Sequence, residues 1–135
     1  MSTTENLQQA LSELFAPWVQ ALNLTVESTQ ADSVTPRLPQ RDHLSRVGGM
    51  LCGQAMMAAA DTAMVLALIQ HFGQFRPCST VQLSSTFMKP LSSQDALVTA
   101  RVLRAGKAMA FGEIDLAGAD DGKSVFRAST TYALM

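Results

Sequence analysis

The segment MAAADTAMVLAL, residues 57–68, is almost wholly apolar, yet it carries a carboxylate, Asp61. The pattern predicts a helix, on which the residues three and four positions from Asp61 are all apolar. Leaving a charge unpaired in such surroundings costs several kcal/mol. A carboxylate retained there is a candidate general base or nucleophile. The alternative is a structural aspartate, hydrogen-bonded to Thr62, to a backbone group or to a partner chain.

Gly53 stands at the expected start of the same helix, eight residues before Asp61. Free N–H groups and the helix dipole favour negative charge at such a position, and glycine lets a carbonyl group approach closely. Gln54 and Asp61 fall within about 20° of one helix face, roughly 10 Å apart along the axis. A backbone donor and a carboxylate are together the groups that attack on a carbonyl carbon without a metal requires. At this separation, however, the two cannot act on one carbonyl.

Three residues close to Gly53 in the sequence have two interpretations each. Cys52 is either a nucleophile near the positive end of the helix or a small, buried apolar residue, which we favour. Gln54 either contacts substrate or caps the helix, and Arg46 either contacts substrate or lies in a solvated loop. No metal site is expected, because Cys52 and Cys78 show no ligand spacing.

Other candidate substrate contacts are basic or apolar. Lys89 in FMKP, with Arg104 and Lys107 in LRAGK, are the best basic candidates for contacts with an anionic group, with solvated surface as the alternative. Met57 and Val65 are candidates for an acyl pocket on the helix, with core filling as the alternative.

The composition indicates one soluble domain, residues 1–135. The chain is 47% hydrophobic and 16% charged, with a net charge of −1, so neither nucleic acid nor an anionic membrane is expected as its main partner. The N-terminus does not have the pattern of a secretory signal, and a cytoplasmic location is expected. Residues 50–72 are long enough for a membrane span, but polar residues interrupt them and Asp61 would lie near the bilayer centre. We therefore expect a buried core helix over about 53–72.

The rest of the chain supplies one helix and a sheet. A helix is predicted over 4–22, bent or broken at Pro17. A strand and a second extended piece follow, and Pro36 and Pro39 confine that second piece to an edge or loop. After the central helix, apolar residues alternate in four strands; the first places Val81, Leu83, Ser85 and Phe87 on one face.

Turn sequences such as RAGK and ADDGK predict that these four strands are joined consecutively by hairpins. The apolar face of the resulting antiparallel sheet needs a cover, and the central helix is the one segment apolar enough. Its many alanines allow close contact. The sequence thus predicts an α+β hotdog fold, an antiparallel sheet wrapped around a long central apolar helix.

The segment GGMLCGQAMMAAADTA resembles the signature of hotdog-fold acyl-CoA thioesterases of the phenylacetic-acid-degradation type. In that family a Gly-x-x-His-Gly-Gly loop opens the central helix, and an acidic residue follows seven positions after the last glycine. Residues 49–54 occupy the place of the loop, and Asp61 follows Gln54 by seven positions. TVQLSSTFMKP is similar to the family's Thr-x-x-Leu-x-x-x-Phe-x-x-Pro strand, and the likeness extends over residues 46–134.

The resemblance implies an acyl-CoA thioesterase in which Asp61 is nucleophile or general base and the Gly53 amide holds the oxyanion. It also implies a homodimer whose sites combine the glycine amide of one protomer with the acid of the other, with a dimer of dimers as a compatible assembly. Coenzyme A enters only as part of the substrate, and its phosphates are the groups that Lys89, Arg104 and Lys107 would contact. No other cofactor is expected. The chain departs from the family at Cys52, Gln54 and Arg46, where histidine, glycine and an asparagine or glutamine are usual.

Two alternatives stay open at this level. One is a non-catalytic module that binds acyl-CoA or another acyl ligand on the same fold. The other, a hydratase-type hotdog, is weaker, because those enzymes rely on a histidine–aspartate pair and the histidine position here is Cys52.

Overall fold

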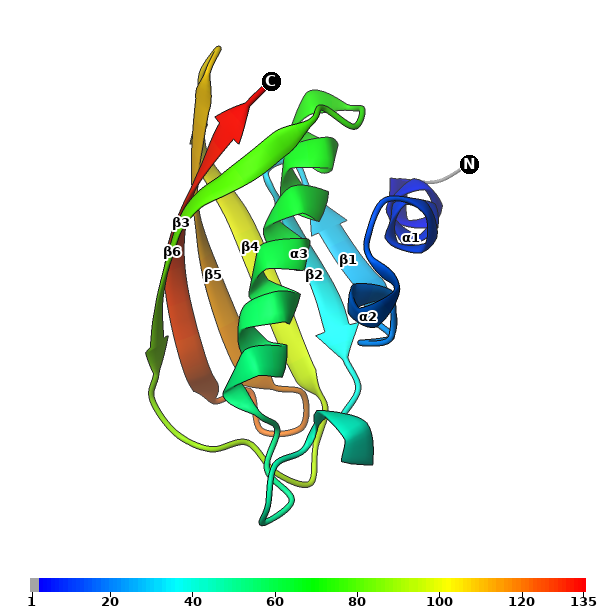
Figure 1. Cartoon of the computed structure of the whole chain (residues 1–135), viewed down its shortest axis with the longest axis vertical. Coiled ribbons are helices and arrows are strands. Elements are labelled where there is room, and N and C mark those ends of the chain that lie inside the picture. The colour runs from blue at the N-terminus through cyan, green and yellow to red at the C-terminus, as the bar shows by residue number, and fades with distance from the viewer. Residues whose placement is uncertain (1–2) are drawn as a thin grey trace.

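A six-stranded antiparallel sheet curves around one long helix (Figure 1). The computed structural model describes residues 3–135. The helices are α1 (Thr3–Glu13), α2 (Pro17–Gln20), the short 3₁₀ helix η1 (Asp42–Leu44) and α3 (Gly53–Phe72). The strands are β1 (Thr25–Gln30), β2 (Ser33–Leu38), β3 (Cys78–Phe87), β4 (Ala96–Ala105), β5 (Met109–Gly118) and β6 (Ser124–Leu134). This is the predicted α+β hotdog architecture.

The central helix occupies the predicted residues, Gly53–Phe72. It ends at Gly73, whose φ of +78° favours glycine and whose N–H donates to the Ile69 carbonyl at 2.8 Å. Four alanines on the sheet side are completely buried: Ala59, Ala60, Ala63 and Ala67. Among residues 3–135, α3 is the one helix long and apolar enough to cross a membrane. A mostly buried core helix meets the same criterion of length and composition.

Gly112 of β5 lets α3 approach the sheet closely. A Cβ atom at this position would lie 2.2 Å from the Met64 Cε atom and 2.9 Å from the Arg101 carbonyl oxygen. The Met64 side chain, 1% exposed, therefore lies in space that the absent side chain leaves. Small residues on both the helix and the sheet thus determine their separation.

The strand order, β1-β2-β4-β5-β6-β3, corrects one prediction. Hairpins do connect β4, β5 and β6, but β3 pairs with β6 rather than with β4. Residues 88–95 cross below the start of α3 instead of turning back, and there the Leu51 N–H donates to the Leu91 carbonyl at 2.9 Å (Figure 1). The prediction of four consecutive hairpin-connected strands is therefore wrong for the first of them, and β3 lies at the edge of the sheet.

The structural effect of proline was predicted correctly at Pro17, which breaks a helix, and wrongly at Pro36, which was expected at an edge or in a loop. The helix predicted over 4–22 is two helices, α1 and α2, and Pro17 is the first residue of α2, where its missing N–H costs nothing. The strand β2, in contrast, is internal, between β1 and β4, although it contains Pro36. The β2–β4 pairing skips Pro36, and β1 bulges opposite it, so no N–H is required there.

Candidate active site

Asp61 lies half-buried on the flank of α3 that faces β3 and β6. Its Oδ1 atom accepts a hydrogen bond from the Thr80 hydroxyl at 2.8 Å and another from the phenol of Tyr132. The same phenol oxygen lies 3.0 Å from the main-chain oxygen of Asp61. The carboxylate in the apolar helix is thus held by two hydroxyl donors from two strands.

A bulge in β3 brings Thr80 into this position. Thr80 and Tyr132 are paired across β3 and β6, but the register shifts between Thr80 and Gln82. Val81, predicted on the apolar face with Leu83, is instead 58% exposed, because the extra residue changes the alternation. That part of the prediction is wrong, and the bulge is the reason Thr80 faces the helix.

Neither hydroxyl partner of Asp61 was predicted from the sequence. For the alternative of a structural aspartate, Thr62 was named as one bonding partner. The Thr62 hydroxyl instead donates to the Ala58 carbonyl at 2.8 Å. A buried tyrosine needs an acceptor for its hydroxyl, and this rule was the one available signal.

Two titratable groups border the carboxylate. Burial, and then the charge of Asp61, raise the pKa of Tyr132 far above its usual value, so the phenol remains a donor at all physiological pH values. Burial, followed by the charge of Asp61, also raises the pKa of the Cys78 thiol. Cys78 is therefore a poor candidate for a reactive thiolate.

Gly53, the first residue of α3, follows the extended residue Cys52, and no side chain caps the helix. Its N–H group belongs to the first turn and has no intrahelical acceptor. The residue borders a groove of about 350 Å³. The groove is lined by Arg46, Met50, Leu51, Gly53, Met56, Phe87, Met88, Lys89 and Pro90. Within residues 3–135 the Gly53 N–H thus has no hydrogen-bond acceptor, and Gly53 borders a mainly apolar groove with two basic side chains, Arg46 and Lys89.

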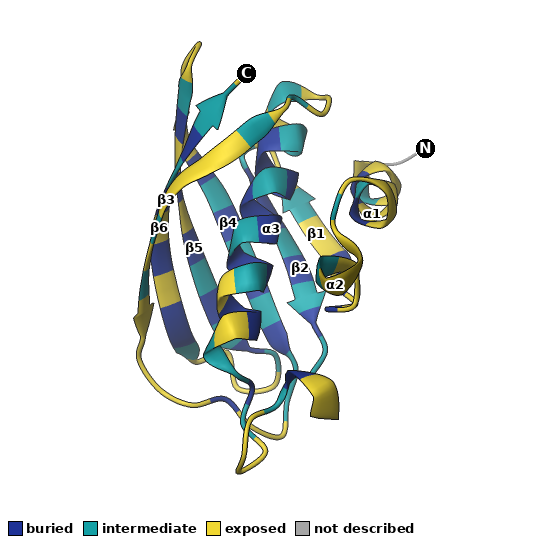
Figure 2. Cartoon of the chain, in the orientation of Figure 1, coloured by how far each residue is buried: buried dark blue, intermediate teal, exposed yellow. Residues whose placement is uncertain are grey.

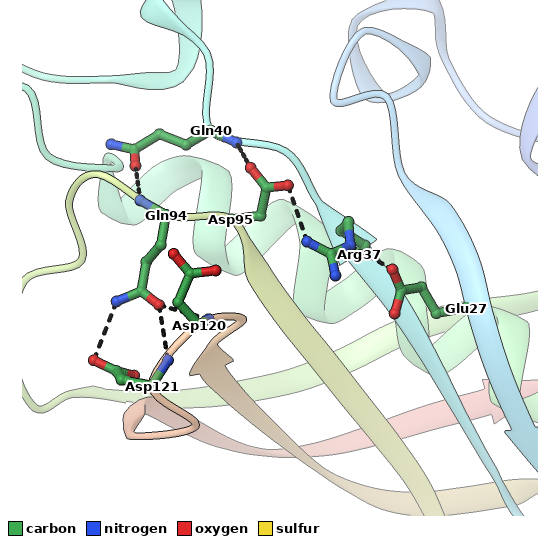
Figure 3. A network of polar contacts seen from close by, with 7 residues as sticks. All are labelled: Glu27, Arg37, Gln40, Gln94, Asp95, Asp120 and Asp121. Atoms are coloured by element: carbon green, nitrogen blue, oxygen red, sulfur yellow. Dashed lines mark hydrogen bonds and ion pairs between the residues drawn. The ribbon is translucent and has the colours of Figure 1, made fainter.

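A polar network braces the loop that leads to Gly53 (Figure 3). The Gln40 side-chain amide donates to the Gly49 carbonyl at 2.8 Å, within a turn where Gly48 and Gly49 have φ values of +98° and +80°. The Gln40 backbone N–H donates to Asp95 at 2.9 Å, and its side-chain oxygen accepts from the Gln94 N–H at 3.0 Å. The loop is therefore tied to the start of β4.

The same network reaches two further elements (Figure 3). Arg37 of β2 donates to Asp95 at 3.1 Å and also pairs with Glu27 of β1. On the other side, the Gln94 side-chain oxygen accepts from the N–H groups of Asp120 and Asp121 in the β5–β6 turn. These contacts fix the loops beside the start of α3.

Asp95 gives this network a defined pH dependence. The Gln40 N–H, and then Arg37, hold the pKa of the Asp95 carboxyl below its usual range. A carboxyl whose pKa falls on folding stabilises the protein above its ordinary pKa and loses this contribution as the pH falls through the lowered value. We expect Asp95→Asn to lower the melting temperature at pH 7, with the gap to wild type closing below about pH 4. Thermal melts across pH measure this.

Asp120→Asn is the matched control for that comparison, since the backbone N–H of Asp120, not its carboxylate, joins the network. It should leave the melting temperature within about one degree of wild type, as expected of an exposed surface substitution. A gap for Asp95→Asn that is equally wide at pH 3 and pH 7 would contradict the assignment.

The other predicted residues of α3 lie on one uncovered face. Gln54 and Met57 are exposed, Met57 at 38%, and Val65 is half-buried. Figure 2 shows exposed and intermediate bands on α3. Within residues 3–135 the Gln54 side chain makes no hydrogen bond, so it does not cap the helix. Cys52 is half-buried against the core, in line with a small apolar role.

The basic candidates divide between the two ends of α3. Arg46 and Lys89 border the groove at Gly53. Lys107 lies beyond the other end, where its carbonyl accepts from Arg76 at 2.6 Å and the Arg76 guanidinium lies over the ring of Phe72. Arg104 is exposed at the end of β4, next to the same turn. Within one chain, therefore, Lys89 lies at the groove, whereas Arg104 and Lys107 do not.

Asp61 and Gly53 are also separated in one chain. Eight helical residues span about 12 Å, too far for both groups to contact one carbonyl. A different hollow, of about 340 Å³, lies on the outer side of the sheet around Arg101 and Arg127, and it includes neither residue. Within the described residues 3–135, no three His, Cys, Asp or Glu side chains gather as metal ligands would.

A family model described as the thioesterase superfamily matches residues 48–125, which include Gly53, Asp61 and Thr80. The chain belongs to the thioesterase superfamily. A predicted esterase of Thermoplasma acidophilum is 25% identical over 125 residues, covering 90% of this chain and 92% of that protein.

Solved structures of the thioesterase superfamily have the same fold. Mouse thioesterase superfamily member 2 superposes with a TM-score of 0.88 at 23% identity, covering 100% of this chain and 99% of that one. A Haemophilus influenzae thioesterase has a TM-score of 0.88 at 19% identity, covering 100% and 92%. Membership of the thioesterase superfamily supports thioester hydrolysis as the general activity.

Proposed function

We propose that the protein is an acyl-CoA thioesterase of the phenylacetic-acid-degradation type, acting in the cytoplasm as a homodimer. The observation that carries the proposal is the pair formed by a held carboxylate, Asp61, and a free helix N-terminal N–H at Gly53, which opens into an apolar groove. These are the base or nucleophile and the oxyanion donor of a metal-independent thioester hydrolase.

The separation of about 12 Å along α3 is the argument for a shared site. If two α3 helices lie antiparallel about a two-fold axis near Met57, each Asp61 faces the partner subunit's Gly53, because an isologous contact is reciprocal. The uncovered face of α3 and the unpaired edge of β3 are surfaces that such a dimer would cover. A dimer of dimers remains a compatible larger assembly.

The chemistry follows from these two groups. In one route Asp61 takes a proton from water while the water oxygen bonds to the thioester carbonyl carbon, and the partner subunit's Gly53 N–H binds the resulting oxyanion. Collapse breaks the C–S bond, and the proton on Asp61 passes to the thiolate, giving a carboxylic acid and free coenzyme A. In the other route an Asp61 oxygen bonds to the carbonyl carbon and expels the thiolate. Water then hydrolyses the anhydride, which releases the carboxylic acid and restores the Asp61 carboxylate, and the remaining proton of the water passes to the thiolate.

The groove supports an apolar substrate attached to a phosphorylated carrier. Its methionines and Phe87 are suited to a medium-chain or aryl acyl group, because thioether side chains adapt to ligand shape. Arg46 and Lys89 supply positive charge for the phosphates of coenzyme A. In a dimer, the end of β4 and the β4–β5 turn of the partner would be the second source of basic residues, Arg104 and Lys107.

The test is a panel of short-chain, medium-chain and aryl-CoA thioesters, with free thiol measured by a colorimetric reagent. We expect saturable release of thiol, with the highest kcat/KM for an apolar medium-chain or aryl substrate. Saturable binding without thiol release for every member would contradict the proposal and favour the non-catalytic acyl-ligand module.

A further inference from the structure

The two oxygens of the Asp61 carboxylate have different surroundings. Oδ1 accepts both hydrogen bonds, from Thr80 and from Tyr132. Within residues 3–135, Oδ2 accepts none. An ionised carboxylate has about four acceptor positions. Two donors of the protein occupy Oδ1, and Oδ2 can still accept a hydrogen bond or react.

The side chain of Tyr132, which donates to Oδ1 of Asp61, is itself held in one orientation. Its side chain is 1% exposed on the inner face of β6, and an aromatic ring in a filled core has one orientation. The phenol has one proton, and the carboxylate, as the charged acceptor, takes it in preference to the main-chain oxygen of Asp61. Tyr132 also lies outside residues 48–125, the segment that matches the thioesterase superfamily.

We propose that Tyr132 is a positioning residue that, together with Thr80, holds Oδ1 of Asp61 and so makes Oδ2 the reacting oxygen. The proposal rests on the proposed function, in which this carboxylate is the base or nucleophile. Rotation about the terminal torsion of an aspartate is otherwise broad and two-fold. Two donors on one oxygen select one rotamer before substrate binds, which is the preorganisation that catalysis requires.

The groups that bear on the ionisation of Asp61 are few. The titratable side chains bordering it from the strands are Tyr132 of β6 and Cys78 of β3, and both carry raised pKa values because of burial and of the Asp61 charge. Its neighbours on α3 are apolar. Hydrogen bonds donated to a carboxylate favour its ionised form, so removing one should move the acid limb of the pH–rate profile to higher pH.

The experiment compares Tyr132→Phe with Thr62→Val. Both remove a buried hydroxyl near Asp61, but the Thr62 hydroxyl bonds only to the Ala58 carbonyl. For Tyr132→Phe we expect a fall in kcat of roughly tenfold or more, as for loss of a hydrogen bond to a charged group, a KM within about twofold of wild type, and an acid limb shifted upward. Thr62→Val should leave all three unchanged. Circular dichroism and thermal melts confirm folding.

Thr80→Val is the second variant, because it removes the other donor to Oδ1 at an exposed edge strand and leaves the core intact. It should move kcat and the acid limb in the same direction. Equal losses in Tyr132→Phe and Thr62→Val, or an unchanged kcat and acid limb in Tyr132→Phe, would overturn the positioning role.

A readout without turnover separates this proposal from the proposed function. High-resolution crystal structures of wild type and of Tyr132→Phe compare the rotamer of the Asp61 side chain. One Asp61 rotamer in wild type, with a rotated side chain or several rotamers in Tyr132→Phe, supports the placement even if no thioester is cleaved, and the same single rotamer in both contradicts it. Absence of thiol release from wild type, in turn, refutes only the proposed function.

Discussion

Replacing Asp61 by Asn is expected to reduce kcat for the best acyl-CoA substrate by about 10²- to 10⁴-fold, the contribution of a positioned general base. Asn keeps the size of the side chain and an oxygen that can accept from Thr80 and Tyr132, but it can neither take a proton from water nor form an anhydride. The melting temperature should therefore change little while turnover is lost. The measurement is thiol release at saturating substrate, together with a thermal melt.

Asp120→Asn is the control for this substitution, because it makes the same chemical change in an exposed turn. It should retain wild-type turnover. Turnover of Asp61→Asn within about threefold of wild type would exclude Asp61 from the chemistry, given the size of the effect that a general base contributes. The protein would then be a thioesterase with another base, or a binding module.

Replacing Gly53 by Pro is expected to reduce kcat by about 10²- to 10³-fold, the effect of removing one oxyanion donor. Proline removes the N–H group and is otherwise suited to this position. It is favoured at the first residue of a helix, and Cys52 before it is extended, with a ψ of 151°, as a residue preceding proline must be. The helix should therefore form normally. The measurement is kcat and KM for the best substrate.

Gly53→Ala is the matched control, because it adds a Cβ atom but keeps the N–H. The new atom would lie 3.1 Å from Cε1 of Phe87, the outer part of an exposed ring that can shift by a few tenths of an ångström. We expect activity within a few-fold of wild type. Equal losses for the two variants would mean that space beside Phe87, rather than the N–H, matters at Gly53.

The part of the fold that depends on α3 was predictable from the sequence. A segment that is apolar nearly all round must be buried, and Gly73 ends it where the pattern ends. The order of the strands in the sheet was not predictable. Alternation of apolar and polar residues identifies the apolar face of a strand but not the strand with which it pairs. The β3–β4 connection has the length of a loop that could close a hairpin, yet its contacts with Leu51 and Met50 carry it across the sheet.

The same limit applies to the site. Asp61 stands out in the sequence because a carboxylate conflicts with the apolar helix around it. Gly53 stands out because it begins the helical pattern. Tyr132 and Thr80 do not, since a tyrosine and a threonine are ordinary strand residues. Their contact with Asp61 depends on the β3–β6 pairing and on a bulge at Val81, which are long-range features. Lys107 illustrates the reverse case, a plausible phosphate contact that the fold places far from Gly53 within one chain.

The shared site is tested most directly by mixing Asp61→Asn with Gly53→Pro. Each variant alone lacks one group in every site. If the two are refolded or co-expressed together in equal amounts, half of the dimers are mixed and one of the two sites in each combines an intact Asp61 with an intact Gly53, so about a quarter of wild-type activity should return. A mixture that remains as inactive as its two components, although mixed dimers are present, would contradict a site built from both chains.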